Sequence, residues 1–97
     1  MIIPKSLTVG FTKYSIEQPE TLTRYRQGLI EYGTHTISIA KKSTVTGAYS
    51  PVEREDTFWH ELTHAVLHDM EHPLRNNEEF VIRFSTRLSK AIRTARF

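Results

Sequence analysis

Five consecutive residues near the middle of the chain have side chains that could bind and use a metal ion. Residues 60–64 read His-Glu-Leu-Thr-His, the H-E-x-x-H pattern. In a helix, positions four apart lie on one face, one turn from each other, so His60 and His64 can bind a single Zn²⁺. Glu61 lies beside the first histidine, where its carboxylate can act as general base toward a water on the metal. The spacing therefore predicts a zinc site on a helix, with a catalytic base next to it.

A catalytic zinc site usually has a third protein ligand and an open position for water. Four later side chains are candidates for the third ligand: His68, His72, Glu78 and Glu79. His68 would lie about 12 Å from His60 along a regular helix, too far to share one ion. His72 follows the expected helix end and could return only through a tight turn. The metzincin pattern is excluded, because the chain has Leu67 and Met70 where that pattern needs Gly and His.

Glu78 and Glu79 lie where a second helix should begin, and two arguments separate them. If Asn76 caps that helix, Glu79 is its capping-box partner and its carboxylate is already engaged. On a helical wheel, Glu78 lies nearer the apolar stripe of the helix, whereas Glu79 points away from it. We therefore prefer Glu78 as the third ligand and keep Glu79 as the alternative.

The residues before the motif predict the start of the helix that would carry it. Ser50 can cap the helix, Pro51 suits the first helical position, and Glu53 completes a capping box. Pro73 prevents much continuation, so we expect the helix to run from Pro51 to about Glu71.

The two faces of this helix differ in character. By 100° steps, its apolar stripe consists of Phe58, Leu62, Ala65 and Val66. His60, His64 and His68 fall on the opposite side. Core packing is the expected role of Phe58 and of its neighbour Trp59.

A second helix should cover the histidine face. It is expected to start after a cap at Asn76 or Asn77 and to run to about Ala95. Its apolar stripe consists of Phe80, Val81, Phe84, Leu88, Ala91 and Ile92. Its basic residues lie away from that stripe, and we interpret them as a solvated face: Arg83, Arg87, Lys90, Arg93 and Arg96.

The first half of the chain predicts strands. Alternating apolar residues mark strands at Leu7 to Phe11 and His35 to Ala40, and Leu29 to Tyr32 is a further short strand between them. The turn at Gly33 joins the last two into a hairpin. The segments Ser15 to Thr23 and Lys41 to Tyr49 are expected to be loops. The predicted fold class is α+β, a small three-stranded, mainly antiparallel sheet packed on the motif helix and a C-terminal helix.

Size and composition fit one globular domain covering residues 1–97. Hydrophobic residues make up 38% and charged residues 25% of the chain. Cysteine is absent, which excludes disulfides and thiolate metal sites and fits a reducing cytosol. The first residues lack a long apolar run, so we expect neither a signal peptide nor a membrane span. The net charge of +2 is too small to indicate a nucleic-acid partner by itself.

From Ser50 to Ile92 the chain resembles the minimal gluzincins, small phage and mobile-element metallopeptidases related to the ImmA/IrrE-like family. The resemblance depends on the motif with its acidic and aromatic lead-in, Glu53 to His68, and on the stretch Asn77 to Phe84. It implies zinc on the two motif histidines and on a glutamate of the next helix. In such proteins a small or apolar residue follows that glutamate by three positions and a Phe by six. Glu78 meets this pattern and Glu79 does not.

The resemblance implies a zinc-dependent endopeptidase that acts on a protein or peptide substrate in the cytoplasm of a bacterium or phage-infected host cell. The strand at His35 to Ala40 would then hold an extended substrate by β-addition. An oxyanion partner near the metal is commonly Tyr or His, and Tyr49 and His72 are candidates. Two alternatives stay open: a zinc-binding module without catalysis, and a nucleic-acid-associated regulator that uses the basic last helix.

Overall fold

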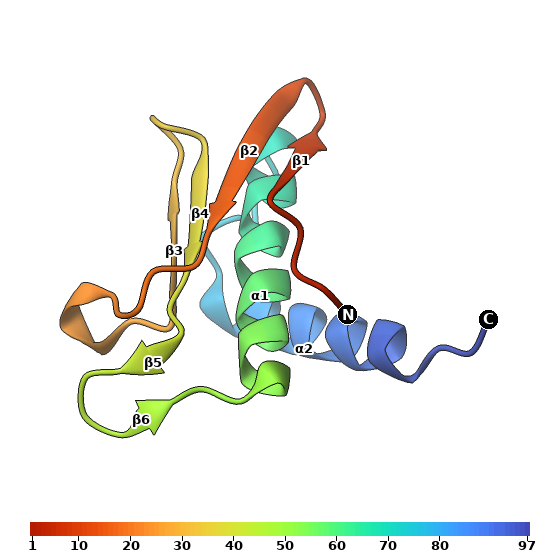
Figure 1. Ribbon diagram of the computed structural model, residues 1–97. Coiled ribbons are helices and arrows are strands. Elements are labelled where there is room, and N and C mark those ends of the chain that lie inside the picture. Colours follow the sequence, from red (N-terminus) through yellow and green to blue (C-terminus); the bar gives the residue numbers. More distant parts are fainter.

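Two helices and two small sheets make up the fold of residues 1–97, all of which are described by the computed structural model (Figure 1). The elements in chain order are β1 (Ser6–Val9), β2 (Thr12–Glu17), a 3-10 turn (Thr23–Tyr25), β3 (Gly28–Glu31), β4 (Thr36–Ile39), β5 (Lys42–Ser43), β6 (Gly47–Ala48), α1 (Pro51–Asp69) and α2 (Glu78–Thr94). The α+β class predicted from the sequence is confirmed. No helix has both the length and the apolar character that crossing a membrane requires.

The main sheet has four strands in the order β1-β2-β4-β3, and it combines parallel with antiparallel pairs. β1 pairs antiparallel with β2, β2 parallel with β4, and β4 antiparallel with β3. The prediction of a three-stranded, mainly antiparallel sheet was therefore wrong in its details. The missing strand is β2, whose second half lies in the expected loop Ser15 to Thr23.

Two corrections follow from the position of β2. Tyr14 and Ile16 are buried and alternate with exposed residues, so β2 has the period-two pattern of a half-buried strand, which Pro19 obscured. Phe11, predicted to lie in the first strand, is instead fully exposed in the turn between β1 and β2. The predicted loop from Lys41 to Tyr49 contains the short hairpin of β5 and β6.

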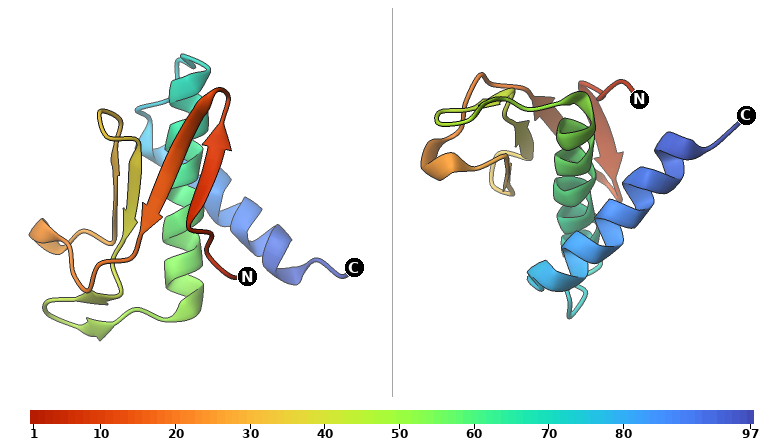
Figure 2. Two further views of the ribbon diagram at one scale, coloured as in Figure 1. Left: turned by 45° about the horizontal axis from the view of Figure 1, so that its top comes forward. Right: turned by 90° about the horizontal axis from the view of Figure 1, so that it is seen from below.

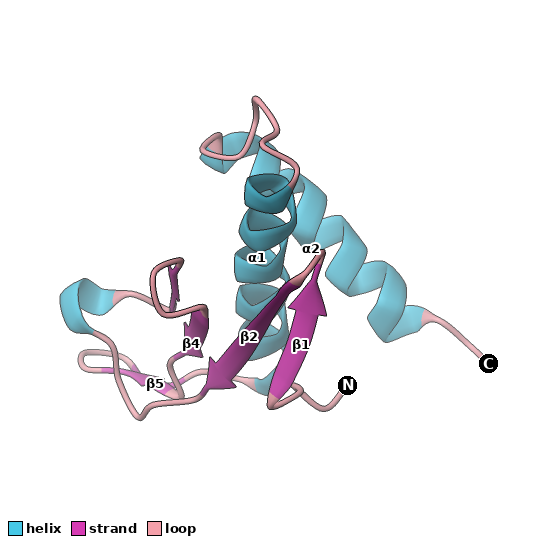
Figure 3. Cartoon of the chain, turned by 90° about the horizontal axis from the view of Figure 1, so that it is seen from above, coloured by secondary structure: helices cyan, strands magenta, loops and turns pink.

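The core lies between the main sheet and α1. Ile37 and Ile39 of β4 are completely buried and belong to one apolar cluster with Phe58 and Ala65 of α1. Figure 2 shows β1 and β2 on one side of α1 and α2 on the other, and Figure 3 shows the same layers from above. One face of α1 is thus covered by the sheet, which leaves the histidine face to α2.

The start of α1 has the predicted cap at Ser50, without the reciprocal bond between the Glu53 carboxylate and the Ser50 backbone N–H. The Ser50 side chain accepts a hydrogen bond from the backbone N–H of Glu53 at 3.1 Å, and its hydroxyl lies 3.2 Å from the Glu53 carboxylate. The helix ends at Asp69, slightly before the predicted end. Val66, predicted to lie in the apolar stripe, is 39% exposed, because it lies at the border of the buried face.

The buried face of α2 differs from the predicted apolar stripe. The cap is Asn77, whose side chain accepts a hydrogen bond from the Phe80 N–H at 3.0 Å. The residues that α2 buries are Val81, Ser85 and Ser89. Phe84 of the predicted stripe is instead 49% exposed. Small residues let α2 approach α1 closely, and the Ser89 hydroxyl donates a 2.6 Å hydrogen bond to Asp56.

Candidate metal centre

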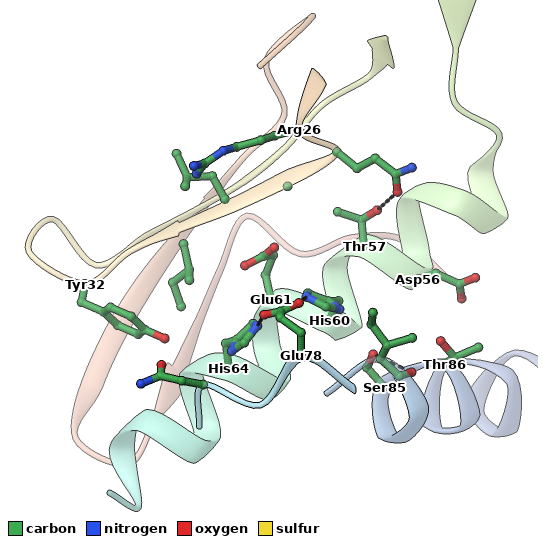
Figure 4. A pocket seen from close by; sticks show the side chains of 16 residues that line it. Arg26, Tyr32, Asp56, Thr57, His60, Glu61, His64, Glu78, Ser85 and Thr86 are labelled. Carbon is green, nitrogen blue, oxygen red and sulfur yellow. Dashed lines mark hydrogen bonds and ion pairs between the residues drawn. The ribbon is translucent and has the colours of Figure 1, made fainter. Parts of the chain in front are cut away.

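His60, His64 and Glu78 converge on one point between the two helices (Figure 4). The Nε2 atom of His60 lies 3.2 Å from Oε2 of Glu78, and Nε2 of His64 lies 2.6 Å from Oε1 of the same carboxylate. One ligand atom from each residue lies within 4.8 Å of the others. The histidines lie one turn apart on α1, and Glu78 is the first residue of α2. The structure thus brings together the three side chains preferred from the sequence.

The separations of the three groups suit a zinc ion. With bonds of 2.0–2.1 Å, two ligand atoms on a tetrahedral zinc lie about 3.3 Å apart. The observed separation of 3.2 Å from His60 to Glu78 matches that distance. The 2.6 Å from His64 to Glu78 is shorter and would widen by a few tenths of an ångström around an ion. Two imidazoles and one carboxylate also form the donor set of known catalytic zinc sites.

The hydrogen bond at the far side of the His64 ring supports a ligand role. Nδ1 of His64 lies 2.9 Å from the backbone carbonyl of Arg75. A carbonyl can only accept, so Nδ1–H is the donor, and in the neutral ring Nε2 carries a lone pair directed at Glu78. Two acceptors at 2.6 Å repel each other unless a proton or a metal ion lies between them. Burial lowers the pKa of His60, which favours the neutral imidazole that binds metal.

Glu61 lies on α1 beside these ligands and points toward β3 (Figure 4). Its side chain is buried, with 8% of the residue exposed. Burial raises the pKa of Glu61 from 4.5 to about 7, while His64 opposes the rise. A carboxyl group with this pKa can both accept and release a proton near neutral pH.

An open cavity of about 660 Å³ lies over the candidate centre. Its walls are β3, α1 and α2, and its lining residues include Gln27, Gly28, Leu29, Ile30, Asp56, Thr57, Ile82, Ser85 and Thr86. β3 is an edge strand, because it pairs with β4 alone. The edge strand expected at His35 to Ala40 is instead β4, which lies between β2 and β3. The cavity therefore has an unpaired backbone edge along one wall.

Tyr32 is a candidate functional residue that the sequence arguments missed. Its ring stacks on His68, with centroids 3.8 Å apart, and its hydroxyl points into the cavity (Figure 4). Burial, and then the nearby Tyr14, Glu61 and Glu78, raise the pKa of Tyr32. The phenol therefore stays protonated and can donate a hydrogen bond. The sequence did place Tyr32 at the end of an expected strand. It gave no sign that this strand lies beside the motif on α1.

The two earlier oxyanion candidates do not line this cavity. Nδ1 of His72 accepts a 3.0 Å hydrogen bond from the Leu74 N–H, which holds the imidazole within its own turn. Tyr49 follows β6 and pairs through its backbone with Lys41. The structure therefore places neither residue in the wall of this cavity.

The remaining sequence candidates lie outside the cluster. Glu79 is exposed, with its carboxylate 3.8 Å from Arg83. His68 packs against Tyr32 and does not reach the other histidines. Trp59 packs against the core, in an edge-to-face contact with Phe58.

No family model matches this chain, and no curated protein or solved structure was found to match it either. Assignment of a function therefore depends on the chemistry of the site.

Proposed function

We propose that this protein is a zinc-dependent endopeptidase of the minimal gluzincin type, with His60, His64 and Glu78 as metal ligands and Glu61 as general base. The observation that carries the proposal is the convergence of two histidines and one carboxylate beside a buried glutamate, in a cavity bordered by an edge strand.

Bound zinc would supply Lewis acidity, which lowers the pKa of a coordinated water and polarises the scissile carbonyl. Glu61 would take the proton of the attacking water and then deliver it to the leaving amine. Burial raises the pKa of Glu61 to about 7 in the metal-free site. A zinc ion beside it would lower that pKa and so favour the carboxylate, the form that accepts the proton of the water.

The position of β3 supports an extended peptide as the substrate. A peptide added to the free edge of β3 would use backbone hydrogen bonds for affinity and would pass over Glu61. Tyr32, which follows the last residue of β3, would donate its phenolic O–H to the oxyanion that forms on the substrate. The open cavity gives room for side chains on both sides of the cleaved bond.

The test combines zinc content with peptide cleavage in matched variants. Glu61→Gln should keep stoichiometric zinc and lose cleavage, because it removes the base and no ligand. Glu78→Gln should lose both, whereas Glu79→Gln, its exposed neighbour, should keep both. Wild-type protein that holds zinc but cleaves no member of a diverse peptide library would refute the endopeptidase proposal.

One observation favours a second candidate function, a zinc-binding module without catalysis. α2 buries three residues, and Val81 is the one apolar side chain among them, since the other two are serines. An ion bound by Glu78 and the α1 histidines would add a strong link between the helices. If the protein is such a module, the wild type should fold only with zinc bound and should cleave no peptide.

A further inference from the structure

One side of α2 is apolar and exposed although the helix packs against α1. Phe84 is 49% exposed. The rings of Phe80 and Phe84 stack on each other, with centroids 5.7 Å apart. In Figure 2 the C-terminal turns of α2 extend away from the rest of the molecule. Much of the apolar side of this helix is therefore without a partner.

This side does not belong to the candidate metal centre. Two residues along a helix correspond to a rotation of about 200°. Ile82 lines the cavity over the metal ligands, so Phe84 faces the other side of α2. There a separate groove of about 460 Å³ is lined by Leu74, Phe80 and Phe84, among others. We call this groove the α2 groove.

Positive charge borders the α2 groove. Arg83 and Arg87 line it directly, one turn apart on α2. Lys90 follows on the same helix, whereas Arg93 pairs with Asp56 of α1 at 3.5 Å and Arg96 lies beyond the end of α2. The acidic residue in the groove is Glu79, whose carboxylate lies 3.8 Å from Arg83. A ligand with apolar residues and carboxylates would complement both the apolar rings and the positive charge of this surface.

We propose that the α2 groove binds an amphipathic helix with acidic flanks from a partner protein. Apolar side chains on one face of such a helix would cover Phe80 and Phe84, as in other helix-in-groove complexes. Its flanking carboxylates would pair with Arg83 and Arg87. A second copy of this chain fits poorly, because a two-fold contact would bring the same basic helices together. The proposal does not depend on the proposed function.

The experiment uses a synthetic 17-residue helical peptide, as long as α2, with leucines on one face and glutamates beside them. The control peptide has lysines in place of the glutamates. Fluorescence anisotropy should show binding of the acidic peptide only, weakening as salt rises. Phe84→Ser should weaken it about tenfold or more, and Arg87→Ala should also reduce the salt dependence.

Phe11→Ser is the matched control, because Phe11 is fully exposed in the β1–β2 turn and should leave the affinity unchanged. Circular dichroism verifies that each variant is folded. Equal binding of both peptides, or no binding of the acidic one, overturns the proposal. Sedimentation showing a wild-type dimer that Phe84→Ser converts to a monomer overturns it too, in favour of a second copy.

Discussion

Gly28 on the edge strand lies directly against Glu61, the candidate base on α1. A β-carbon at Gly28 would lie 3.1 Å from both Cγ and Oε1 of Glu61, and 2.6 Å from Cγ2 of Thr57. The lack of a side chain at Gly28 therefore allows β3 to lie this close to Thr57 and Glu61 of α1. The contact defines the distance between a substrate bound on β3 and the base.

Gly28→Ala should accordingly displace Glu61 or push β3 away from α1. We expect a loss of roughly 1–3 kcal/mol in the free energy of unfolding, as for other overpacked sites, and a clear fall in kcat with zinc content retained. The matched control is Gly33→Ala, because a β-carbon at Gly33 meets no atom within 4 Å. Urea denaturation and peptide cleavage measure the two effects. Equal behaviour of the two alanine variants would show that the close approach has no role.

The raised pKa of Glu61 predicts a pH dependence of stability in the zinc-free protein. Its pKa is about 7 in the folded state, against an ordinary value of 4.5, so folding favours the protonated form. The contribution of Glu61 to the free energy of unfolding is fully present below pH 4.5 and is lost as the pH rises through 7. The loss is of order 3 kcal/mol.

Glu61→Gln isolates this contribution, because glutamine resembles the protonated acid and does not titrate. The difference in unfolding free energy between the wild type and this variant should change steadily between pH 4.5 and 7.5. Denaturation at several pH values, with a chelator present, measures it. A constant difference across this range would mean that Glu61 is ionised at neutral pH in the folded protein.

Zinc should stabilise the fold through the link that it makes between α1 and α2. At a zinc concentration 100-fold above Kd, the melting temperature should rise by about 10–20 °C relative to the chelated protein. Glu78→Gln should remove most of this rise. Glu79→Gln should retain it, because Glu79 points toward Arg83 and not toward the histidines. If only Glu79→Gln lost the zinc-dependent rise in melting temperature, Glu79 and not Glu78 would be the third ligand.

Tyr32→Phe removes the one phenolic donor that points into the cavity beside Glu61 (Figure 4). We expect kcat to fall by roughly 10²–10³, with KM and zinc content little changed, as for loss of an oxyanion donor. Tyr49→Phe serves as the control, since Tyr49 does not line the cavity. A normal kcat in Tyr32→Phe would assign the tyrosine to packing against His68.

The sequence predicted the elements whose signals are local. Three short-range patterns are present in the structure: the N-cap at Ser50, the end of α1 before Pro73 and the four-residue spacing of the histidines. Glu78 was also preferred from local evidence. One of its two arguments assumed a cap at Asn76, which is wrong because Asn77 caps the helix; the other, its place on the helical wheel, did not depend on that cap.

The features that the sequence did not reveal depend on pairing between distant segments. The parallel pairing of β2 with β4 joins Ile16 to Ile37, and no turn signal connects such strands. The buried side of α2 contains Ser85 and Ser89, which a search for apolar periodicity passes over. Tyr32 reaches the site only because β3 is the edge strand.

Glu78 is the first residue of α2, and the far end of that helix points away from the sheet (Figure 2). Near that end Arg93 pairs with Asp56 of α1 at 3.5 Å. With Glu78 as a zinc ligand, as proposed, metal affinity and the position of the helix would be thermodynamically linked. A molecule that binds α2 and moves its first turn must change the affinity for zinc, and zinc must change the affinity for that molecule by the same factor. A titration of zinc in the presence and absence of a molecule bound to α2 would measure this coupling as the ratio of the two zinc dissociation constants.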